Sequence, residues 1–371
     1  MKFTVSSSEL LRQLSAAYGV IGSSAVLPIL EDFLFKLNGS QLTVIASNLE
    51  TTVITRVEVS TEEDGNIALP AKILLDTLKA LPDQPITIEA DQATNAITLT
   101  SAFGKYKLAG DNPEDYPEIP VSDNDSSFTV SGEVISKALN KTLFATSNDE
   151  LRMAMQGVYL EVDETKLTFV ATDAHKLVKY TFAVSGGPDV STMIIPKKGL
   201  SLLKNALNDD TSVNVVYNKH NIFFNIGDTE VIIRLIDAKF PDYNAVIPLD
   251  NANILTLHRA DFLSSLRRIA IYANKSTNQV VLNLTEGSLT ISSQDLDFSN
   301  EATEQLSCEY NGDSMNIGFN AKFLIEMLSV IGVDEVSFKL STPNRAGILV
   351  PTDKEENEEL IMLVMPVMMS N

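Results

Sequence analysis

Three copies of one pattern run along the 371-residue chain, and this repetition limits the possible folds more than any other feature of the sequence. Residues 42–49 (LTVIASNL) return as 167–174 (LTFVATDA) and again as 289–296 (LTISSQDL). Shorter matches precede and follow these segments in the same order, at a spacing of about 124 residues. Such a chain is built from three similar units rather than around one large core.

The boundaries between the units fall in two proline-containing segments, residues 111–120 and 240–248. Several prolines within so few residues break helices and sheets, and they favour an extended connector. The sequence therefore predicts three domains, which cover residues 1–120, 121–248 and 249–371.

Each unit shows the same order of alternating and helical patterns. In the first unit, a short strand at residues 2–5 leads into an amphipathic helix capped by Ser7 or Ser8, and further alternating strands surround a second helix. The helices expected in the whole chain cover residues 7–18, 71–80, 132–146, 197–207, 259–273 and 320–331. The predicted fold class is α+β, with three similar domains that each pack two helices on antiparallel sheet.

The charge is unevenly distributed along the chain. A net charge of −21 argues against nucleic acid as a partner when it is taken for the whole molecule. The six predicted helices nevertheless hold twelve basic and five acidic residues, a net +7, so the rest of the chain sums to −28. Because salt screens charges beyond about 8 Å, an anion beside the helices responds mainly to them. This partition fits a polyanion held by phosphate contacts without base readout, although solvated helix faces give the same pattern.

Catalysis finds little support in the sequence. The motifs of phosphate loops, dinucleotide folds, serine hydrolases and zinc proteases do not occur, and one cysteine with three histidines leaves little material for a metal site. The triplet 173–175 (DAH) lacks a histidine in its equivalents and is not expected to be catalytic, and the acidic segment 355–359 is interpreted as a solvated loop. No cofactor and no metal are therefore expected.

Compartment and partner type follow from the cysteine count and the C-terminus. A single cysteine, Cys308, indicates a reducing cytoplasm, and the longest apolar run, residues 360–369, is too short to span a bilayer, so no membrane partner is expected. That run contains four methionines in ten residues. A final buried strand accounts for residues 360–364, whereas the apolar residues after Pro366 suit an adaptable surface for peptide partners.

Several motifs together resemble the bacterial DNA polymerase III beta subunit family, the beta sliding clamps. They occur in family order over the whole chain: Met1-Lys2-Phe3-Thr4-Val5, Leu27-Pro28-Ile29-Leu30, Val170-Ala171-Thr172-Asp173-Ala174-His175-Lys176-Leu177, Phe240-Pro241-Asp242-Tyr243, Ile317-Gly318-Phe319-Asn320 and Val364-Met365-Pro366.

The resemblance implies a head-to-tail homodimer in which each chain forms half of a closed ring around double-stranded DNA, with helices lining the hole. It implies a non-catalytic processivity factor that an ATP-driven clamp loader places on DNA. Such a ring tethers the replicative DNA polymerase and other proteins that carry clamp-binding peptides. Because a closed ring is retained by topology, weak and sequence-independent DNA contacts are sufficient.

The resemblance also assigns candidate sites. It places a partner-peptide cleft at Met155, Thr172, Ala174, His175, Lys176, Leu177, Pro241, Val246, Asn320, Phe323, Val364, Met365, Pro366 and Val367. Within that cleft, Leu177, Val246, Val364 and Met365 are expected to form an apolar pocket for the large side chains of a peptide.

Basic residues on the predicted helices, together with Arg152, are the candidate DNA-facing set: Lys72, Lys79, Lys137, Lys141, Arg152, Lys197, Lys198, Lys204, Arg267 and Arg268. The candidate dimer interface joins a late strand of the first domain to the end of a helix in the third: Lys105, Tyr106, Lys107 and Leu108 on one side, and Ile271, Tyr272, Glu301 and Glu304 on the other.

The sequence departs from the family pattern at several of these places. Ala174 stands where glycine is usual, Lys176 where arginine is usual and Ala245 where a basic residue is common. Ser24 replaces a frequent DNA-facing arginine, and the ending 368–371 differs from the usual one. Peptide preference is therefore expected to differ from that of the family.

Two other function classes stay open when the residues are considered without the resemblance. One is an enzyme on a repeated scaffold that acts on an acidic polymer, which a pH-rate profile on candidate substrates would reveal. The other is a protein that coats an acidic polymer such as DNA without encircling it. Linear DNA with blocked or free ends separates a ring from a coat, because a ring is lost from free ends.

Overall fold

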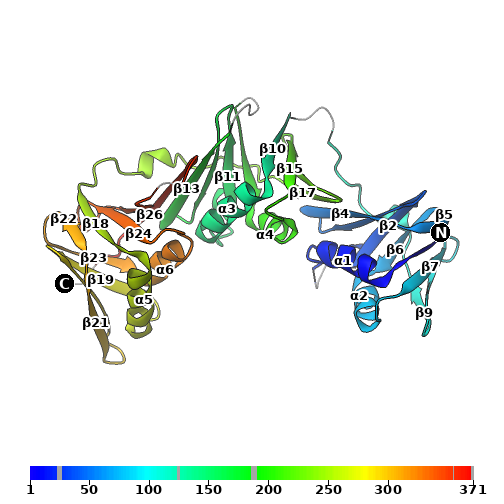
Figure 1. Ribbon diagram of the computed structural model, residues 1–371, viewed down its shortest axis with the longest axis horizontal. Helices are drawn as coiled ribbons and strands as arrows, with labels where there is room; N and C mark the ends of the chain where they lie inside the picture. Colours follow the sequence, from blue (N-terminus) through cyan, green and yellow to red (C-terminus); the bar gives the residue numbers. More distant parts are fainter. Residues whose placement is uncertain (23–26, 123–125, 185–189, 354, 369–371) are drawn as a thin grey trace. The chain divides into compact units, whose positions relative to one another are not determined.

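The computed structural model describes residues 1–22, 27–122, 126–184, 190–353 and 355–368 (Figure 1). Of the residues discussed above, Ser24 and residues 369–371 lie outside these ranges.

The α-helices form where the repeat predicts them. They are α1 (Ser7–Tyr18), α2 (Ala71–Ala80), α3 (Gly132–Thr142), α4 (Lys197–Ala206), α5 (Arg259–Ile269) and α6 (Ala321–Ser329). The predicted cap of the first helix is wrong: the N-cap is Ser6, the last residue of the preceding strand, whose side chain accepts the N–H of Glu9. The helices α3 and α5 are also shorter than expected, because the chain tightens into the 3₁₀ turns η3 (Leu143–Ala145) and η6 (Ala270–Tyr272).

The strands form four antiparallel sheets among the described residues. Sheet A has the order β5 (Ser60–Glu63), β1 (Lys2–Ser6), β7 (Pro85–Asp91), β8 (Ala96–Ser101), β9 (Gly104–Ala109). Sheet B has the order β10 (Ser126–Ser131), β15 (Ser212–Tyr217), β16 (Asn221–Ile226), β17 (Thr229–Arg234), β4 (Thr51–Glu58), β3 (Gln41–Ser47), β2 (Asp32–Asn38), β6 (Gly65–Pro70).

Sheet C has the order β14 (Ser191–Pro196), β11 (Gly157–Val162), β12 (Lys166–Thr172), β13 (Lys176–Ala183), β26 (Glu358–Val364), β25 (Gly347–Pro351), β24 (Glu335–Leu340), β18 (Asn253–His258), β22 (Glu309–Asn311). Sheet D has the order β21 (Asn300–Ser307), β20 (Ser288–Asp295), β19 (Gln279–Thr285), β23 (Met315–Asn320).

Sheets B and C each combine strands from two consecutive repeats. In sheet B, β4 of the first repeat pairs with β17 of the second, and in sheet C, β13 of the second repeat pairs with β26 of the third. The sequence pattern shows the repeats but not these pairings, because strands so far apart in the chain share no local signal. Pairing removes an exposed edge from each of the four strands.

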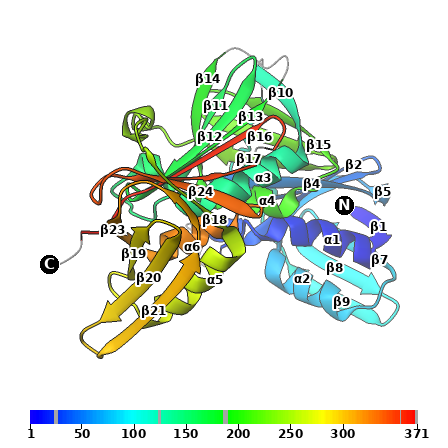
Figure 2. The same cartoon turned by 60° about the vertical axis from the view of Figure 1, so that its left-hand side comes forward.

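By internal packing the chain divides into two units: Met1–Ser136 with Lys198–Leu235, and Lys137–Lys197 with Ile236–Asn371. In the first unit, α1 and α2 pack against each other and against strands of sheet B (Figure 1). In the second unit, α5 and α6 pack against each other, α5 contacts β20 and β21, and α6 contacts β23 and β26 (Figure 2).

The two proline-containing linkers are not simply extended. The first contains the 3₁₀ turn η2 (Pro113–Asp115) and the second contains η5 (Asn244–Val246). The same backbone bond joins the chain to its sheet at the first residue of the first linker and four residues before the second: the N–H of Asp111 donates to Ala68 at 2.9 Å, and the N–H of Ile236 donates to Ile194 at 2.9 Å.

The third repeat ends in the same way, since the N–H of Val367 donates to the carbonyl of Gly318 at 2.8 Å. Asp111, Ile236 and Val367 are therefore equivalent positions. The C-terminal tail, which here means residues 365–368, lies on the third repeat as the linkers lie on the first two.

Candidate partner cleft and basic surfaces

The hairpin turn between β12 and β13 lies at the centre of the candidate cleft. The Asp173 carboxylate accepts the backbone N–H groups of His175 and Lys176, both at 2.9 Å. Thr172 Oγ1 accepts the N–H of Ala174 at 3.1 Å and donates to the carbonyl of Lys176 at 2.7 Å. Asp173 thus organises the backbone of the turn, which agrees with the absence of a catalytic role for this triplet.

Ala174 occupies a backbone conformation that favours glycine. Its φ is 74°, in the left-handed region where a Cβ is unfavourable. The glycine that is usual in the family would meet this requirement without strain, so the substitution noted in the sequence has a local conformational cost.

Lys176 is fixed within the protein rather than exposed. Its side chain is 6% exposed, and its Nζ lies 2.8 Å from Asp173 Oδ2 and 3.2 Å from Glu326 Oε2, the latter an ion pair without hydrogen-bond geometry. The same Nζ lies 4.2 Å from the centroid of the Phe323 ring. The His175 ring stacks on Phe323 with centroids 6.3 Å apart. Lys176 therefore links the hairpin to α6 through these contacts.

The predicted apolar pocket is wrong in one respect, because it joins residues from opposite faces of sheet C. Leu177 pairs with Leu363, and Lys176 pairs with Val364. Directly opposed residues share a face and neighbours along a strand alternate, so Leu177 and Val364 point to opposite sides. Leu177 is 2% and Val364 0% exposed, which leaves neither side chain open to a peptide in this conformation.

Leu177 and Leu363 belong instead to a core cluster beneath the second linker. The cluster includes Phe240 and Tyr243 of that linker. Sequence reasoning missed Leu363, which the alternation of strand β26 places beside Leu177. It also missed Glu326, although its spacing of three residues from Phe323 puts both on one face of α6.

The exposed part of the cleft set surrounds the tail. The Met365 N–H donates to the carbonyl of His175 at 2.8 Å, and the Met365 side chain is 41% exposed. Pro366 and Val367 are half-buried, and Asn320 caps α6 by accepting the N–H of Lys322 at 2.9 Å. The tail therefore lies beside His175.

The other residues of the predicted cleft come from the second linker and from the turn η4. Val246 and Pro241 are exposed on the second linker, with Val246 55% exposed. Met155 is half-buried in the turn η4 (Met153–Gln156), where its carbonyl accepts the N–H of Ser147 at 2.8 Å.

A polar cavity of about 450 Å³ lies beside the hairpin turn, lined by Phe144, Thr146, Ser147, Asn148, Asp149, Arg152, Asp173, His175, Lys176, Lys197 and Glu326. Arg152 forms an ion pair with Asp149 at 3.3 Å, and Lys197 donates to Asn148 at 3.3 Å. Both residues belong to the predicted DNA-facing set, and they lie among acids and amides beside the cleft.

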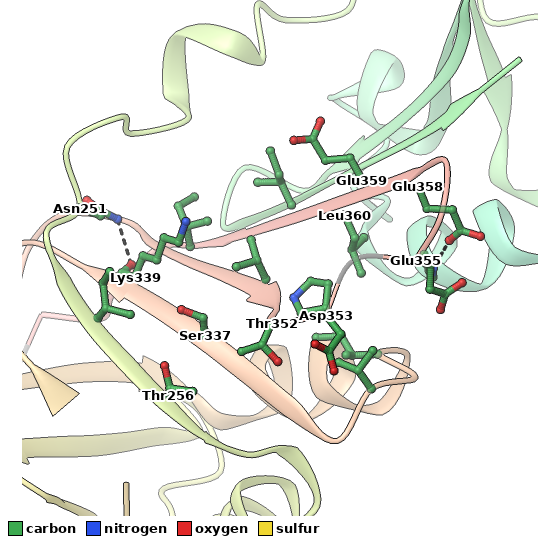
Figure 3. A pocket seen from close by; sticks show the side chains of 18 of the residues that line it. Asn251, Thr256, Ser337, Lys339, Thr352, Asp353, Glu355, Glu358, Glu359 and Leu360 are labelled. Carbon is green, nitrogen blue, oxygen red and sulfur yellow. Dashed lines mark hydrogen bonds and ion pairs between the residues drawn. The ribbon is translucent and has the colours of Figure 1, made fainter. Parts of the chain in front are cut away.

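A second cavity of about 640 Å³ lies on the linker side of sheet C (Figure 3). The amide of Asn251 donates to the carbonyls of Lys339 and Ala346 and holds the end of the linker over it. Acidic side chains, among them Asp353 and Glu359, line its other end.

Two of the residues predicted to face DNA are ion-paired within the protein. Lys141 contacts Glu358 at 2.8 Å, and Lys137 contacts Glu358 at 2.9 Å and Glu355 at 3.0 Å. Burial raises the pKa of Glu358, but the hydrogen bonds from Lys141 and Lys137 outweigh it and lower the pKa to about 2. The segment 355–359 is therefore not merely a solvated loop, because its carboxylates pair with these two lysines.

Arg268 and Glu304 form a further pair that the sequence analysis assigned to two different surfaces. The guanidinium donates two hydrogen bonds to the carboxylate, at 2.7 and 2.6 Å. These bonds raise the pKa of Arg268 and lower that of Glu304. The remaining basic residues of the predicted DNA-facing set, which are Lys72, Lys79, Lys198, Lys204 and Arg267, are exposed.

The predicted dimer interface falls on two end strands. Lys105, Tyr106, Lys107 and Leu108 lie on β9, at one end of sheet A, and Glu301 and Glu304 lie on β21, at one end of sheet D. Ile271 is 66% and Tyr272 44% exposed, in the turn η6 that contacts β20 and β21. Further exposed apolar residues that the sequence analysis missed are Phe103, next to β9, and Leu296 and Phe298, before β21.

Within the described ranges, no group of three or more His, Cys, Asp or Glu side chains is placed to hold a metal ion, and no helix is long and apolar enough to cross a membrane.

Three models of the DNA polymerase III beta subunit match the chain: the N-terminal domain at residues 1–120, the central domain at 129–242 and the C-terminal domain at 244–367. The chain belongs to the DNA polymerase III beta subunit family. Family membership confirms the expected clamp fold, the function of a DNA sliding clamp and the non-catalytic role.

The curated relatives carry the name beta sliding clamp. The one from Pseudomonas aeruginosa is 29% identical over 98% of this chain and 99% of the relative, and the one from Vibrio cholerae is 28% identical over 99% and 100%. Among solved structures, a DNA polymerase sliding clamp from Pseudomonas aeruginosa covers both chains fully with a TM-score of 0.94 at 29% identity. A sliding clamp from Bartonella birtlesii bound to griselimycin has a TM-score of 0.93 at 28% identity.

Proposed function

We propose that two copies of this clamp subunit associate head to tail into a ring around double-stranded DNA, with β9 of one copy pairing with β21 of the other. The observation that carries the proposal is the pairing between consecutive repeats. β4 of the first repeat pairs with β17 of the second, and β13 of the second pairs with β26 of the third. The corresponding strands that are left are β21 of the third repeat and β9 of the first, and each stands at the end of its sheet.

The strand pairs β4·β17 and β13·β26 also indicate the register expected for the proposed pair of β9 and β21. In them Thr52 pairs with Ile232, and Leu177 pairs with Leu363. Ile232 and Leu363 each lie four residues before the equivalent positions Ile236 and Val367, so the matching residue of β9 is Lys107, four before Asp111.

The partner of Lys107 follows from the hairpins. Thr52, Leu177 and Glu301 pair with Ser47, Thr172 and Gln294, which occupy one position of the repeat. Glu301 of one copy therefore lies directly opposite Lys107 of the other, and an opposed pair of opposite charge stabilises a strand pair. Ile271, Tyr272, Leu296 and Phe298 supply the apolar area, since exposed ion pairs add at most about 1 kcal/mol each.

The surface around the tail is the proposed site for partner peptides. His175 stacked on Phe323, Met365 beside it and Val246 on the second linker present apolar surface, and methionine adapts to different partners. Burial of two or three large peptide side chains, at roughly 1.5 to 3 kcal/mol each before ordering costs, gives affinity in about the micromolar range. The replicative polymerase, the ATP-driven clamp loader and other DNA-processing proteins are the proposed partners.

The exposed lysines of α2 and α4 together with Arg267 of α5 are the proposed phosphate contacts. Their positive charge attracts the duplex without reading its sequence.

We propose the three domains at residues 1–120, 121–248 and 249–371. We also propose the cytoplasm as the compartment, in agreement with the reducing environment that the cysteine count indicates.

Cysteine cross-linking tests the register. Lys107→Cys with Glu301→Cys, in a Cys308→Ser background, is expected to give a covalent dimer under mild oxidation, because opposed Cβ atoms lie about 4.5 to 5.5 Å apart. Lys105→Cys with Glu301→Cys is the matched control, one diagonal step of about 7 to 8 Å out of register. Equal cross-linking of both pairs, or of neither, contradicts the proposed strand pairing.

Retention on DNA tests the ring itself. Loaded clamp is expected to stay on nicked circular DNA and to be lost when the circle is cut, whereas a coating protein stays on both. Ile271→Ala with Tyr272→Ala is expected to give monomers by light scattering and to abolish retention. Leu249→Ala removes a side chain that is 98% exposed away from these strands and serves as the control. Retention of the double variant on circular DNA would contradict the dimer surface.

A further inference from the structure

Two carboxyl groups, those of Asp32 and Asp111, approach each other at the start of the first linker. Asp32, the first residue of β2, is 5% exposed, and its Oδ2 is buried without a hydrogen-bond partner. Besides burial, the charge of the neighbouring Asp111 carboxyl and a side-chain hydrogen bond with it raise the pKa of Asp32. An ionised carboxylate only accepts hydrogen bonds, so these two groups are complementary only when one of them carries a proton.

The backbone fixes this arrangement. Asp32 pairs with Pro70 of β6, while Leu34 of β2 and Asp111 of the linker pair with Ala68 from the two sides of β6. Asp32 and Leu34 are two residues apart on one strand, so the side chains of Asp32 and Asp111 project from the same face of the sheet. Ala68, which has a small side chain, lies directly opposite Asp111 on this face.

The surroundings of the buried Asp32 carboxyl are acidic. The groups that act on the charge of Asp32 are Asp111, Glu31 and the phenol of Tyr116. Burial of Asp32, followed by the charge of Asp111 and the hydrogen bond to it, raises the pKa of Asp32 to about 7. Tyr116 of the linker is 7% exposed, and its burial together with the charge of Asp32 raises the pKa of its phenol.

The carboxyl pair is absent from the other two repeats, although the backbone geometry is the same. The residues equivalent to Asp32, judged from their pairing with Pro196 and Asn320, are Gly157 and Gln279. The residues equivalent to Asp111 are Ile236 and Val367. The backbone bond from the position of Asp111 therefore forms without acidic side chains in the other two repeats. The presence of Asp32 and Asp111 at the first linker calls for a separate explanation.

We propose that Asp32 and Asp111 share one proton and form a proton-dependent latch that fastens the first linker to sheet B. With the proton in place, one carboxyl donates to the other and the bond between Asp111 and Ala68 is supported by a side-chain bond beside it. When the proton leaves, the charge of Asp111 faces a like charge on the buried Asp32 carboxylate. Asp32 is held within β2, whereas Asp111 is exposed, so Asp111 turns toward solvent and the start of the linker detaches.

Carboxyl NMR and hydrogen exchange on the full-length protein test the latch. The Asp32 carboxyl is expected to titrate near pH 7, and the protection factor of the amide at position 111 is expected to fall about tenfold as the pH rises from 6 to 8, since one proton is lost. Asp111→Asn supplies an amide donor at all pH values. In that variant the Asp32 midpoint drops by about one pH unit or more, and protection at position 111 becomes independent of pH.

Asp115→Asn makes the same chemical change at an exposed position of the same linker and serves as the matched control, with the behaviour of the unchanged protein expected. Titration of Asp32 near its ordinary value of about 4, or an equal pH dependence in Asp111→Asn, would refute the shared proton. Protection restored at pH 8 by magnesium or calcium chloride in the unchanged protein, but not in Asp111→Asn, would also overturn the proposal, since a cation would then take the place of the proton.

Discussion

The two linkers have the same place in consecutive repeats, yet they are attached to their sheets by different means. The first linker buries one aromatic residue, Tyr116, against sheet B, and its hydroxyl lies near the backbone of Ser47 without forming a hydrogen bond. The second buries Phe240 and Tyr243 against sheet C, and Tyr243 donates to Glu161 at 2.6 Å. Beside the first linker stands the carboxyl pair Asp32 and Asp111.

The difference shows that the same backbone arrangement accommodates a pair of carboxyl groups at the first linker and a cluster of aromatic rings at the second. Tyr159 stacks on Phe240 with ring centroids 4.6 Å apart and only 6° between the planes, so the second linker is part of an aromatic cluster. Burial of Tyr243 and its bond to Glu161 both raise the pKa of the phenol, which keeps it a donor at any ordinary pH. The second linker is therefore held independently of pH, and the first one is not.

The largest expected effect comes from removing the aromatic anchor. Phe240→Ala is expected to destabilise the protein by about 3 to 5 kcal/mol, because it deletes a buried ring and leaves a cavity under the second linker. Pro113→Ala, three residues before Tyr116 as Phe240 is three residues before Tyr243, removes only a half-buried ring. Urea unfolding measures both variants. Equal losses would mean that the aromatic cluster does not distinguish the linkers.

A smaller effect is expected from the two tyrosine hydroxyls. Tyr243→Phe leaves the Glu161 carboxylate without its donor and is expected to cost about 1 to 3 kcal/mol. Tyr116→Phe removes a hydroxyl that has no partner and is expected to be neutral or slightly stabilising. The two substitutions are chemically identical, so thermal unfolding of the pair isolates the hydrogen bond. A cost for Tyr116→Phe that matches that of Tyr243→Phe would show that the first hydroxyl is bonded in solution.

The sequence predicted what local periodicity and repetition encode. The six helices and the equivalence of the three units follow from apolar spacing, and family motifs identify the clamp. The joining of β4 to β17 and of β13 to β26 has no local signal, so the continuity of sheets B and C across repeats was not predicted.

The candidate sites illustrate the same limit. The resemblance placed Leu177 and Val364 in one pocket, and only the register shows that they lie on opposite faces. Charge counting made Lys137 and Lys141 candidates for DNA contact. Their partner Glu358, more than two hundred residues away in the chain, could be found only from the tertiary structure.

The smallest expected effect is a difference in the direction of pH dependence between the two sheets. Glu358 in sheet C has a folded pKa of about 2 against an ordinary value of 4.5, so its ion pairs contribute stability that is present above pH 4.5 and is lost as the pH falls toward 2. Asp32 in sheet B has the opposite shift, from 3.8 to about 7, so its contribution is present below pH 3.8 and is lost as the pH rises through 7. The melting temperature is therefore expected to fall by a few degrees as the pH falls from 4.5 toward 2, and also as it rises from 3.8 through 7. Glu358→Gln is expected to remove only the fall on the low-pH side, and Asp111→Asn is expected to reduce only the fall on the high-pH side, because Asp32 stays buried. If either variant flattens both sides, the two carboxyl sites are coupled, and the linkers do not differ in the way that their surroundings indicate.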